Sequence, residues 1–552
     1  MFSSLRQCTS WLHTWTGLIV GWVLFFVFVT GTPGYFQIEI TRWMQPELPM
    51  VQARALENRA ASFELALDRL QKVAPGAAAW RINLPHESLQ SRTWQEFGIG
   101  WDEMPPDGHD RGPSGSEKLD PATGQVLPSG IEPRATAGGR TLYQMHYLLH
   151  YMDFDWGIRI VGVCTMLMLM AIVTGVITHK KIFKDFFTFR PGKGQRSWLD
   201  AHNAVSVMAL PFFLMITYSG LVFFLFTYMP AGINAIYGSD QQSRKPYFAE
   251  IFPEFNRKPV AISRPETPLL PLVAQAEAVW GPGQVRTIGV MHNQGAGEVQ
   301  TVTLTRVNGS ALDFQRPQTL RFDARSGAPL APEPKTGGAA RTTQTVMLNL
   351  HEGLFVGAWG RWVYFMAGLL GCAMIGTGMV LWTVKRRRHH LGSGLEATEQ
   401  FGVRLVETLN VATIAGLPMA VAAYFLANRL LPLDITDRPA WEVHTLFAVW
   451  LGALFYALAR PLHRAWIELF WAGCAAYALV PVINALTTDK HLLNTLRAGD
   501  WVLAGFDLTM WGMAALLALM AVKVKRRLDP ARAARKAAGA AAALPVTEGS
   551  VA

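Results

Sequence analysis

The feature that most constrains the fold of this chain is the segregation of its charged residues. Seven stretches contain no Asp, Glu, Lys or Arg: residues 7–38, 160–178, 201–239, 362–384, 408–428, 443–459 and 469–488. An eighth apolar segment, about 501–522, carries only Asp507. A helix needs about 20 mostly apolar residues to cross the hydrocarbon core of a bilayer. The sequence therefore predicts eight membrane spans.

The basic residues are also segregated, and their positions predict a topology. The formal net charge of +10 would fit a nucleic-acid partner. The basic clusters, however, lie between the apolar stretches, at 179–196, at 385–390, around Arg460 and Arg464, and at 523–536. They share one side if the spans alternate, and the positive-inside rule makes that side cytoplasmic, with both termini inside. We therefore expect a multi-pass protein of a lipid bilayer and no nucleic-acid partner.

The two long loops are then extracytoplasmic, and each has the pattern of a small domain. An amphipathic helical pattern at 57–73 is followed by strand-like pieces such as AAWRINL (78–84), which predicts an α+β module. The expected fold class is an all-α polytopic membrane protein with small α+β extracytoplasmic modules. The predicted segments are span 1 (1–40), module 1 (41–150), span 2 (151–180), a cytoplasmic loop (181–198), span 3 (199–235), module 2 (236–348), span 4 (349–385), a cytoplasmic linker (386–402), four additional spans (403–527) and a disordered cytoplasmic tail (528–552).

The first four spans have the pattern of two copies of one unit. An offset of 203 superposes DPATGQVL (120–127) on DARSGAPL (323–330), and an offset of 189 superposes His13 on His202. Further pairs at these offsets are Trp156–Gly157 with Trp359–Gly360, Thr174–Gly175 with Thr377–Gly378, and Thr30–Gly31 with Ser219–Gly220. Chance explains any one match, but the shared order favours duplication. Two copies of the same topology imply a pseudo-two-fold axis along the membrane normal and a four-helix core.

Histidines lie at the predicted ends of these four spans. They are His13 and His202 at the cytoplasmic starts of spans one and three, His146 and His150 before span two and His351 before span four on the outer side, and His179 at the inner end of span two. Histidine is costly in lipid, so one that faces a bundle predicts a function. A single histidine at a helix end more often lies among lipid headgroups. Symmetry-related histidines at both membrane faces favour the functional interpretation.

Paired imidazoles without neighbouring Cys, Asp or Glu suit haem better than a bare metal ion. Structural zinc takes four protein ligands, whereas haem iron needs only two axial ligands. His13 with His202 predicts an inner haem, and His150 with His351 an outer one, although the second pair needs a two-residue gap in the repeat. His146 could replace His150, and His179 is close enough to the inner haem to be a ligand or a proton carrier. Without a CxxCH motif, the expectation is two non-covalent, b-type haems.

Two further sets of residues fit this prediction, each with a simpler alternative. Gly17 and Gly21 follow His13 by one and two turns and would clear space for a porphyrin, or allow close helix packing. Arg159 and Arg361 each follow a Trp-Gly pair at an outer helix start. They could pair with haem propionates or extend to the lipid headgroups.

Over about residues 1–390, the chain resembles the PepSY-associated transmembrane proteins. The resemblance rests on LHTWTGLIVGWVLFFVFVTG, TGVITHKKIFKDFFTFRPGKGQRSWLDAHNAVSVMALPFFLMITYSG, the LH–WG–R starts at 149–159 and 350–361, and the DPATGQVL turn. It implies a bacterial inner-membrane protein whose outer modules are PepSY-like. The branch that it resembles implies a dihaem ferric-siderophore reductase, which moves electrons outward and releases iron as Fe(II) for iron uptake. The resemblance does not extend to 403–527.

The electron donor and the role of the last four spans stay open. No dinucleotide or P-loop motif is found, so electrons are expected from a separate cytoplasmic reductase or from membrane quinol. The acceptor implied by the resemblance is a ferric siderophore on the extracytoplasmic side. Asp507 could handle a proton, or could lie at the headgroups. The alternatives to a reductase are a membrane-anchored PepSY module that binds or regulates a peptidase, and a transporter without redox activity.

Overall fold

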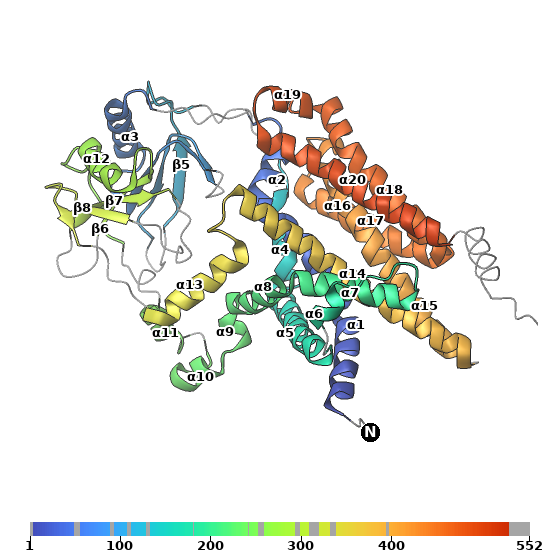
Figure 1. Ribbon diagram of the computed structural model, residues 1–552. Coiled ribbons are helices and arrows are strands. Elements are labelled where there is room, and N and C mark those ends of the chain that lie inside the picture. Colours follow the sequence, from blue (N-terminus) through green and yellow to red (C-terminus); the bar gives the residue numbers. More distant parts are fainter. Residues whose placement is uncertain are drawn as a thin grey trace, which may run out of the picture. The chain divides into compact units, whose positions relative to one another are not determined.

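The structure is a computed structural model, whose helices and strands are labelled in Figure 1. It divides into two compact units. Unit 1 comprises Met1–Met50, Pro133–Leu210 and Met366–Ala552, and unit 2 comprises Val51–Glu132 and Pro211–Phe365. The described residues are 4–48, 56–88, 93–106, 112–127, 133–179, 182–240, 242–251, 259–292, 299–307, 319–331, 338–393 and 397–528. Nearly all of the tail predicted to be disordered, 529–552, lies outside them.

The described chain contains seven helical segments that are long and apolar enough to cross a membrane. They are Leu5–Met44, Phe154–Thr178, Ala358–Arg387, Phe401–Leu430, Arg438–Ala459, Leu462–Thr487 and Trp501–Arg527. The helices that form them are α1 (Leu5–Gly31), α2 (Gln37–Met44), α5 (Phe154–Thr178), α14 (Ala358–Ser393), α15 (Ala397–Val411), α16 (Leu417–Leu430), α17 (Arg438–Ala459), α18 (Leu462–Thr487) and α20 (Trp501–Leu528). The prediction of a helical multi-pass membrane protein is confirmed.

The eighth predicted span, the third along the chain, is broken. It consists of α7 (Gln195–Met208) and α8 (Leu210–Phe223), which count as one span only if a bent pair is accepted. Pro211 follows the break at Ala209. Proline has no N–H to donate, and its ring clashes with the carbonyl four residues earlier, so a continuous helix is interrupted just before it.

Shorter helices connect these segments. The 3-10 turn Thr32–Phe36 joins α1 to α2, and α4 (Gly138–Leu148) precedes α5. In unit 2, α13 (Gly338–Glu352) precedes α14 as α4 precedes α5. The remaining short helices are α6 (Ile182–Phe186), α9 (Leu225–Tyr228), α10 (Ala231–Tyr237), α11 (Lys245–Ile251) and α19 (Leu492–Arg497).

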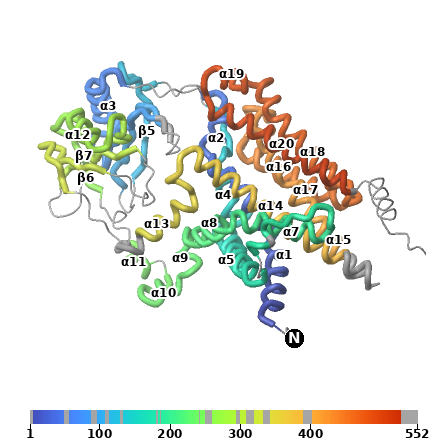
Figure 2. The backbone as a smooth tube through the Cα atoms, in the orientation of Figure 1, coloured from blue at the N-terminus to red at the C-terminus, as the bar shows by residue number. Residues whose placement is uncertain are grey.

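The four additional spans pack on one another and on α1 and α2 within unit 1. Helices α16, α17, α18 and α20 run side by side (Figure 2). Trp22 of α1 donates its indole N–H to Asn410 Oδ1 at 3.0 Å. Asp507 of α20 is fully buried, where it accepts hydrogen bonds from Trp43 Nε1 at 3.0 Å and Asn484 Nδ2 at 3.2 Å. Asp507 therefore does not lie on the surface of unit 1, and it joins α20 to α2.

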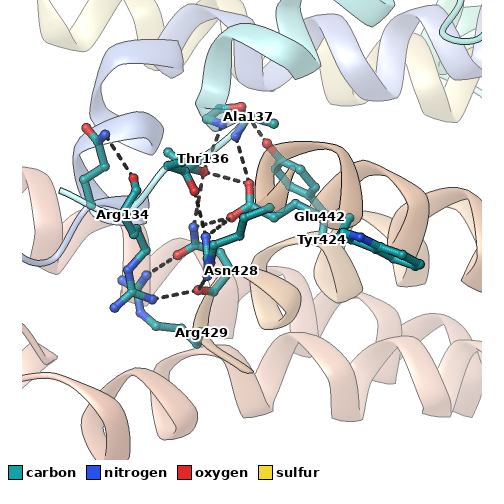
Figure 3. A network of polar contacts seen from close by, with 12 residues as sticks. Arg134, Thr136, Ala137, Tyr424, Asn428, Arg429 and Glu442 are labelled. Atoms are coloured by element: carbon teal, nitrogen blue, oxygen red, sulfur yellow. Dashed lines mark hydrogen bonds and ion pairs between the residues drawn. The ribbon is translucent and has the colours of Figure 1, made fainter. Parts of the chain in front are cut away.

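A buried polar network joins the additional spans to the start of α4 (Figure 3). Glu442 of α17 is fully buried, and its Oε2 accepts from Thr136 Oγ1 at 2.7 Å and from Ala137 N at 2.9 Å. Its Oε1 accepts from Asn428 Nδ2 and Arg438 Nη1, both at 2.7 Å. One carboxylate thus neutralises a buried arginine and satisfies backbone and side-chain donors that precede α4.

We expect Glu442→Ala to lower the stability of the protein by about 3–5 kcal/mol, because it leaves Arg438 as an uncompensated buried charge. The measurement is the free energy of unfolding in detergent. Glu442→Gln retains an acceptor for Ala137 and is the matched control, with a smaller expected loss. Equal stability of Glu442→Ala and the unchanged protein would contradict a structural role for this network.

Unit 2 contains one antiparallel sheet of seven strands in the order β5-β4-β1-β6-β7-β8-β9. The strands are β1 (Ala79–Asn83), β4 (Gly98–Asp102), β5 (Ser114–Lys118), β6 (Val285–His292), β7 (Gln300–Arg306), β8 (Thr319–Asp323) and β9 (Pro329–Leu330), with β2 (His86–Ser88) and β3 (Thr93–Gln95) as a separate pair. Helices α3 (Arg59–Val73) and α12 (Leu269–Trp280) share the sheet's hydrophobic core.

The two long loops therefore build one sheet, where the sequence predicted a module in each. Strands β1 and β6, one from each loop, pair in register, with Ile82 opposite Ile288. An unpaired strand leaves exposed N–H and C=O groups, and this pairing removes two such edges at once. The first loop supplies a helix followed by three strands of the main sheet, and the second loop supplies a helix followed by four strands, which is close to the arrangement that a duplicated unit predicts.

The two aspartate turns show the duplication in atomic detail. Asp120 Oδ1 accepts from Ala122 N, Thr123 N and Thr123 Oγ1. Asp323 Oδ1 accepts from the N–H groups of the corresponding residues and from Ser326 Oγ. Each turn ends in a glycine of positive φ, at 66° and 71°, a conformation that residues with a Cβ rarely adopt.

We expect acid to loosen the contact between α3 and β5. Arg69 donates to Glu117 at 2.7 and 2.8 Å, and this hydrogen bonding holds the pKa of Glu117 below its usual value. A depressed carboxylate pKa stabilises the fold above the unfolded pKa, near 4.5, and this stability is lost as the pH falls through the folded value. Hydrogen exchange of the α3 and β5 amides, corrected for the pH dependence of the intrinsic exchange rate, should show a loss of protection only below about pH 4.5. Arg69→Gln should remove this acid-dependent component, and an unchanged pH profile would contradict the assignment.

Candidate histidine site

The structure brings His13 of α1 and His202 of α7 together inside unit 1. Their ring centres are 6.3 Å apart, and the ring planes are inclined at 61°. Two metal–imidazole bonds of about 2 Å each, together with the depth of both rings, give a centre-to-centre separation of about 6 Å. The two imidazoles are therefore spaced as ligands on opposite sides of one metal ion would be.

Backbone carbonyls fix the tautomer of both rings. His13 Nδ1 lies 2.8 Å from the carbonyl oxygen of Ala171, and His202 Nδ1 lies 2.9 Å from that of Met374. A carbonyl oxygen only accepts, so in each neutral ring Nδ1 carries the proton and Nε2 keeps its lone pair. Metal-binding histidines commonly donate their other N–H in this way, which leaves Nε2 as the ligand atom.

A glycine covers each of these imidazoles. A Cβ on Gly175 of α5 would lie 3.1 Å from Cε1 of His13, and a Cβ on Gly378 of α14 would lie 3.2 Å from Cε1 of His202. Each glycine follows a threonine, and the bonded carbonyl lies three residues before that threonine. We name this arrangement a clip. In a clip, the Nδ1 atom of a histidine bonds to a turn of a neighbouring helix, and the glycine of a Thr-Gly or Ser-Gly pair on that turn covers the ring.

His146 and His351 lie in two further clips. His146 Nδ1 is 2.7 Å from the carbonyl oxygen of Val27, and a Cβ on Gly31 would lie 2.2 Å from the same nitrogen. In unit 2, Ser219 Oγ is 3.1 Å from His351 Nδ1, and a Cβ on Gly220 would lie 2.9 Å from His351 Cε1. Burial lowers the pKa of His146, which favours the neutral ring that can bind a metal.

His150, the outer ligand that the sequence favoured, lies outside α4 in a different environment. It is exposed and stacks on Phe447 of α17 with a ring separation of 5.6 Å. The next residue, Tyr151, has a positive φ of 65° and a hydrogen bond between its hydroxyl and His444 Nδ1. His146 rather than His150 therefore has the local structure shared by His13, His202 and His351.

The other predicted site residues occupy less uniform positions. His179 ends α5 as its C-cap, one turn after Gly175. Arg159 is exposed at the start of α5, whereas Arg361 of unit 2 is buried. The two arginines correspond to each other in the sequence repeat but differ in burial.

Free space and a buried polar atom without a hydrogen-bond partner lie one helical turn from the two imidazoles, at Gly17 and at Ser206. A Cβ on Gly17, one turn above His13, would meet no atom within 4 Å, while Gly21 packs on the side chain of Met379. Ser206, the repeat equivalent of Gly17, has a buried Oγ without a hydrogen-bond partner. Open space beside polar atoms without partners is what a large, partly polar ligand would fill, so these residues fit a haem. Gly17 is consistent with a role in making space, and Gly21 with helix packing.

The ligand set also fits haem better than a bare metal ion. Within the described ranges, no three His, Cys, Asp or Glu side chains come close enough together to hold a metal ion. Two imidazoles suffice when a macrocycle supplies the other four positions. The glycines of the clips were visible in the sequence as repeat markers, but their contact with the histidines was not.

The comparisons with known proteins agree with the span pattern. The PepSY-associated TM region profile matches residues 10–385. An uncharacterised protein of Pseudomonas aeruginosa is 26% identical over 381 residues, which cover 65% of this chain and 88% of the relative. The matched family region contains all four clips and excludes α15 to α20. This chain belongs to the PepSY-associated transmembrane family.

Proposed function

We propose that the chain binds a b-type haem between His13 and His202 and carries electrons across the bacterial inner membrane to an extracytoplasmic ferric siderophore. The observation that carries the proposal is the pair of imidazoles 6.3 Å apart, each with Nδ1 engaged and Nε2 available. A haem supplies reversible one-electron exchange between Fe(III) and Fe(II). The protein residues supply its ligands, its burial and its orientation.

Each residue of the site has a definite task in this proposal. The carbonyl groups of Ala171 and Met374 hold the Nδ1 protons, so that both Nε2 lone pairs point away from the helices that clip them. Gly175 and Gly378 let the Nδ1–Cε1 edge of each imidazole approach the neighbouring helix closely. The packing of α1 on α5 fixes the position of His13 before the cofactor binds.

The clips at His146 and His351 support the proposal of a second b-type haem nearer the extracytoplasmic side. A hydrocarbon core about 30 Å thick separates the two faces, and two cofactors divide that distance into shorter electron transfers. The electrons would come from a separate cytoplasmic reductase or from membrane quinol. The ferric siderophore would be reduced to Fe(II) for uptake.

The absorbance spectrum of the purified protein tests this function first. We expect b-type bands after dithionite reduction and two haems per chain. Stopped-flow mixing of the reduced protein with ferric siderophores, without oxygen, should reoxidise the haem. A folded but colourless protein would favour the PepSY binding or peptidase-regulating alternative, or a transporter. Haem that no ferric chelate reoxidises would exclude the siderophore as acceptor.

A further inference from the structure

An arginine near the end of α14 has no acidic partner among the described residues. The guanidinium carbon of Arg386 lies 5.5 Å from the ring centre of Trp15 and 5.4 Å from that of Trp382. The two indoles are 6.1 Å apart and nearly perpendicular. The next residue, Arg387, pairs with Glu407, so a carboxylate is available on α15 but does not reach Arg386. Arg386 is held in place by two aromatic rings with its N–H donors unused.

This arginine belongs to the surroundings of the His13–His202 pair. Trp382 lies on the same face of α14 as Gly378, one turn further on, and Gly378 covers His202. Trp382 Nε1 is buried and has no hydrogen-bond partner, and the same is true of Asn203 Nδ2 on α7. A buried donor without a partner costs about 1–3 kcal/mol. Trp382 Nε1 and Asn203 Nδ2 therefore each require an acceptor, and Arg386 adds a positive charge next to Trp382.

The chemistry of these donors identifies the kind of acceptor. An indole N–H and a guanidinium can donate but cannot accept. A guanidinium also carries a fixed positive charge, and its fork of N–H groups matches a carboxylate. In a low-dielectric site, a hydrogen bond to an anion is about twice as strong as a neutral one. The ligand group that satisfies this site is consequently an anionic oxygen acceptor.

We propose that Arg386 and Trp382 bind a carboxylate of the molecule held between His13 and His202. This inference rests on the proposed function, in which that carboxylate is a haem propionate. The sequence had suggested a role toward haem propionates for Arg159 and Arg361, which lie at the outer helix starts, whereas Arg386 lies near the other end of α14 from Arg361. A phosphate of a lipid headgroup has the same acceptor chemistry and is the other possible source of the anion.

Redox titration of Arg386→Gln tests the proposal in the full-length protein. Removal of a positive charge beside the haem favours Fe(III), so we expect the Fe(III)/Fe(II) equilibrium of the His13–His202 haem to shift about tenfold toward Fe(III), a fall of about 59 mV. Lys385→Gln and Arg387→Gln remove the same charge from neighbouring positions and should shift it much less. Trp382→Phe, which removes only the indole donor and part of the ring, should lower the potential in the same direction.

Reconstitution separates the two sources of the anion. With haem dimethyl ester, which has no free carboxylate, Arg386→Gln should cause no additional shift if a propionate is the ligand. An effect that persists with the ester and depends on anionic lipid in nanodiscs would overturn the propionate assignment. Coloured Arg386→Gln protein with the potential of Lys385→Gln would overturn the whole inference. If the protein without any substitution is colourless, the proposed function is overturned, and this inference with it.

Discussion

Under the proposed function, replacement of His13 or His202 by alanine is expected to halve the haem content, from two per chain to one. His13 and His202 would each supply one nitrogen ligand, and their ring centres are 6.3 Å apart, which suits one metal ion between them. A haem that loses one of its two protein ligands would be held weakly. The measurement is haem per chain by pyridine haemochrome assay, with electron entry from the cytoplasmic side measured in parallel.

Controls separate the loss of a ligand from a loss of folding. His463 is an exposed histidine of α18, and His463→Ala should retain both haems. In His13→Ala, dithionite should still reduce the remaining haem directly. If His13→Ala keeps two haems while His179→Ala loses one, the ligand on that side is His179 and the assignment of His13 is wrong.

Replacement of His146 by alanine is expected to remove the other haem, whereas His150→Ala should retain both. The reason is that His146 lies in a clip and His150 stacks on Phe447 at the surface of unit 1. Gly31→Ala should reproduce the loss, because the new Cβ would lie 2.2 Å from His146 Nδ1 and must displace the ring. Gly512→Ala on α20 is the matched control, since a Cβ there meets no atom within 4 Å and the position lies outside the clips.

The measurement is again haem content, together with the reduced spectrum of the haem that remains. Overpacking by a methyl group typically costs about 1–3 kcal/mol, so Gly31→Ala protein should still fold. The loss of haem from His150→Ala, with two haems retained in His146→Ala, would show that the clip does not mark the ligand at this position.

The sequence was sufficient for seven of the eight predicted spans and for the proximity of His13 and His202, because both depend on regular spacing. Charge-free stretches identify apolar helices directly, and His13 and His202 match at one offset without a gap. The choice between His146 and His150 could not be made in the same way. Their separations from His351, 205 and 201 residues, both differ from the repeat offset of 203 by two. The register of α4 decides between them, and that register depends on three-dimensional packing.

The pairing of strands from both loops into a single sheet also could not be predicted from the sequence. Strand-like pieces such as Ala79–Asn83 indicate that a strand exists but not which strand it pairs with. The pairing of Ile82 with Ile288 joins residues about 200 positions apart, and no local pattern encodes such a contact. Likewise, Pro211 could be recognised as a helix breaker, but the position of the bend at Ala209 depends on the helices around it.

The four clips have a consequence for how such a protein could arise and assemble. His13 is clipped by Gly175 and His146 by Gly31, all within the first repeat, while His202 with Gly378 and His351 with Gly220 lie within the second. Each repeat thus holds the Nδ1 atoms of its own histidines, whereas the meeting of His13 with His202 requires both repeats. A half-length ancestor could have formed the same pair across the two-fold axis of a homodimer. During synthesis, the clips of His13 and His146 can therefore form before the second repeat has been made.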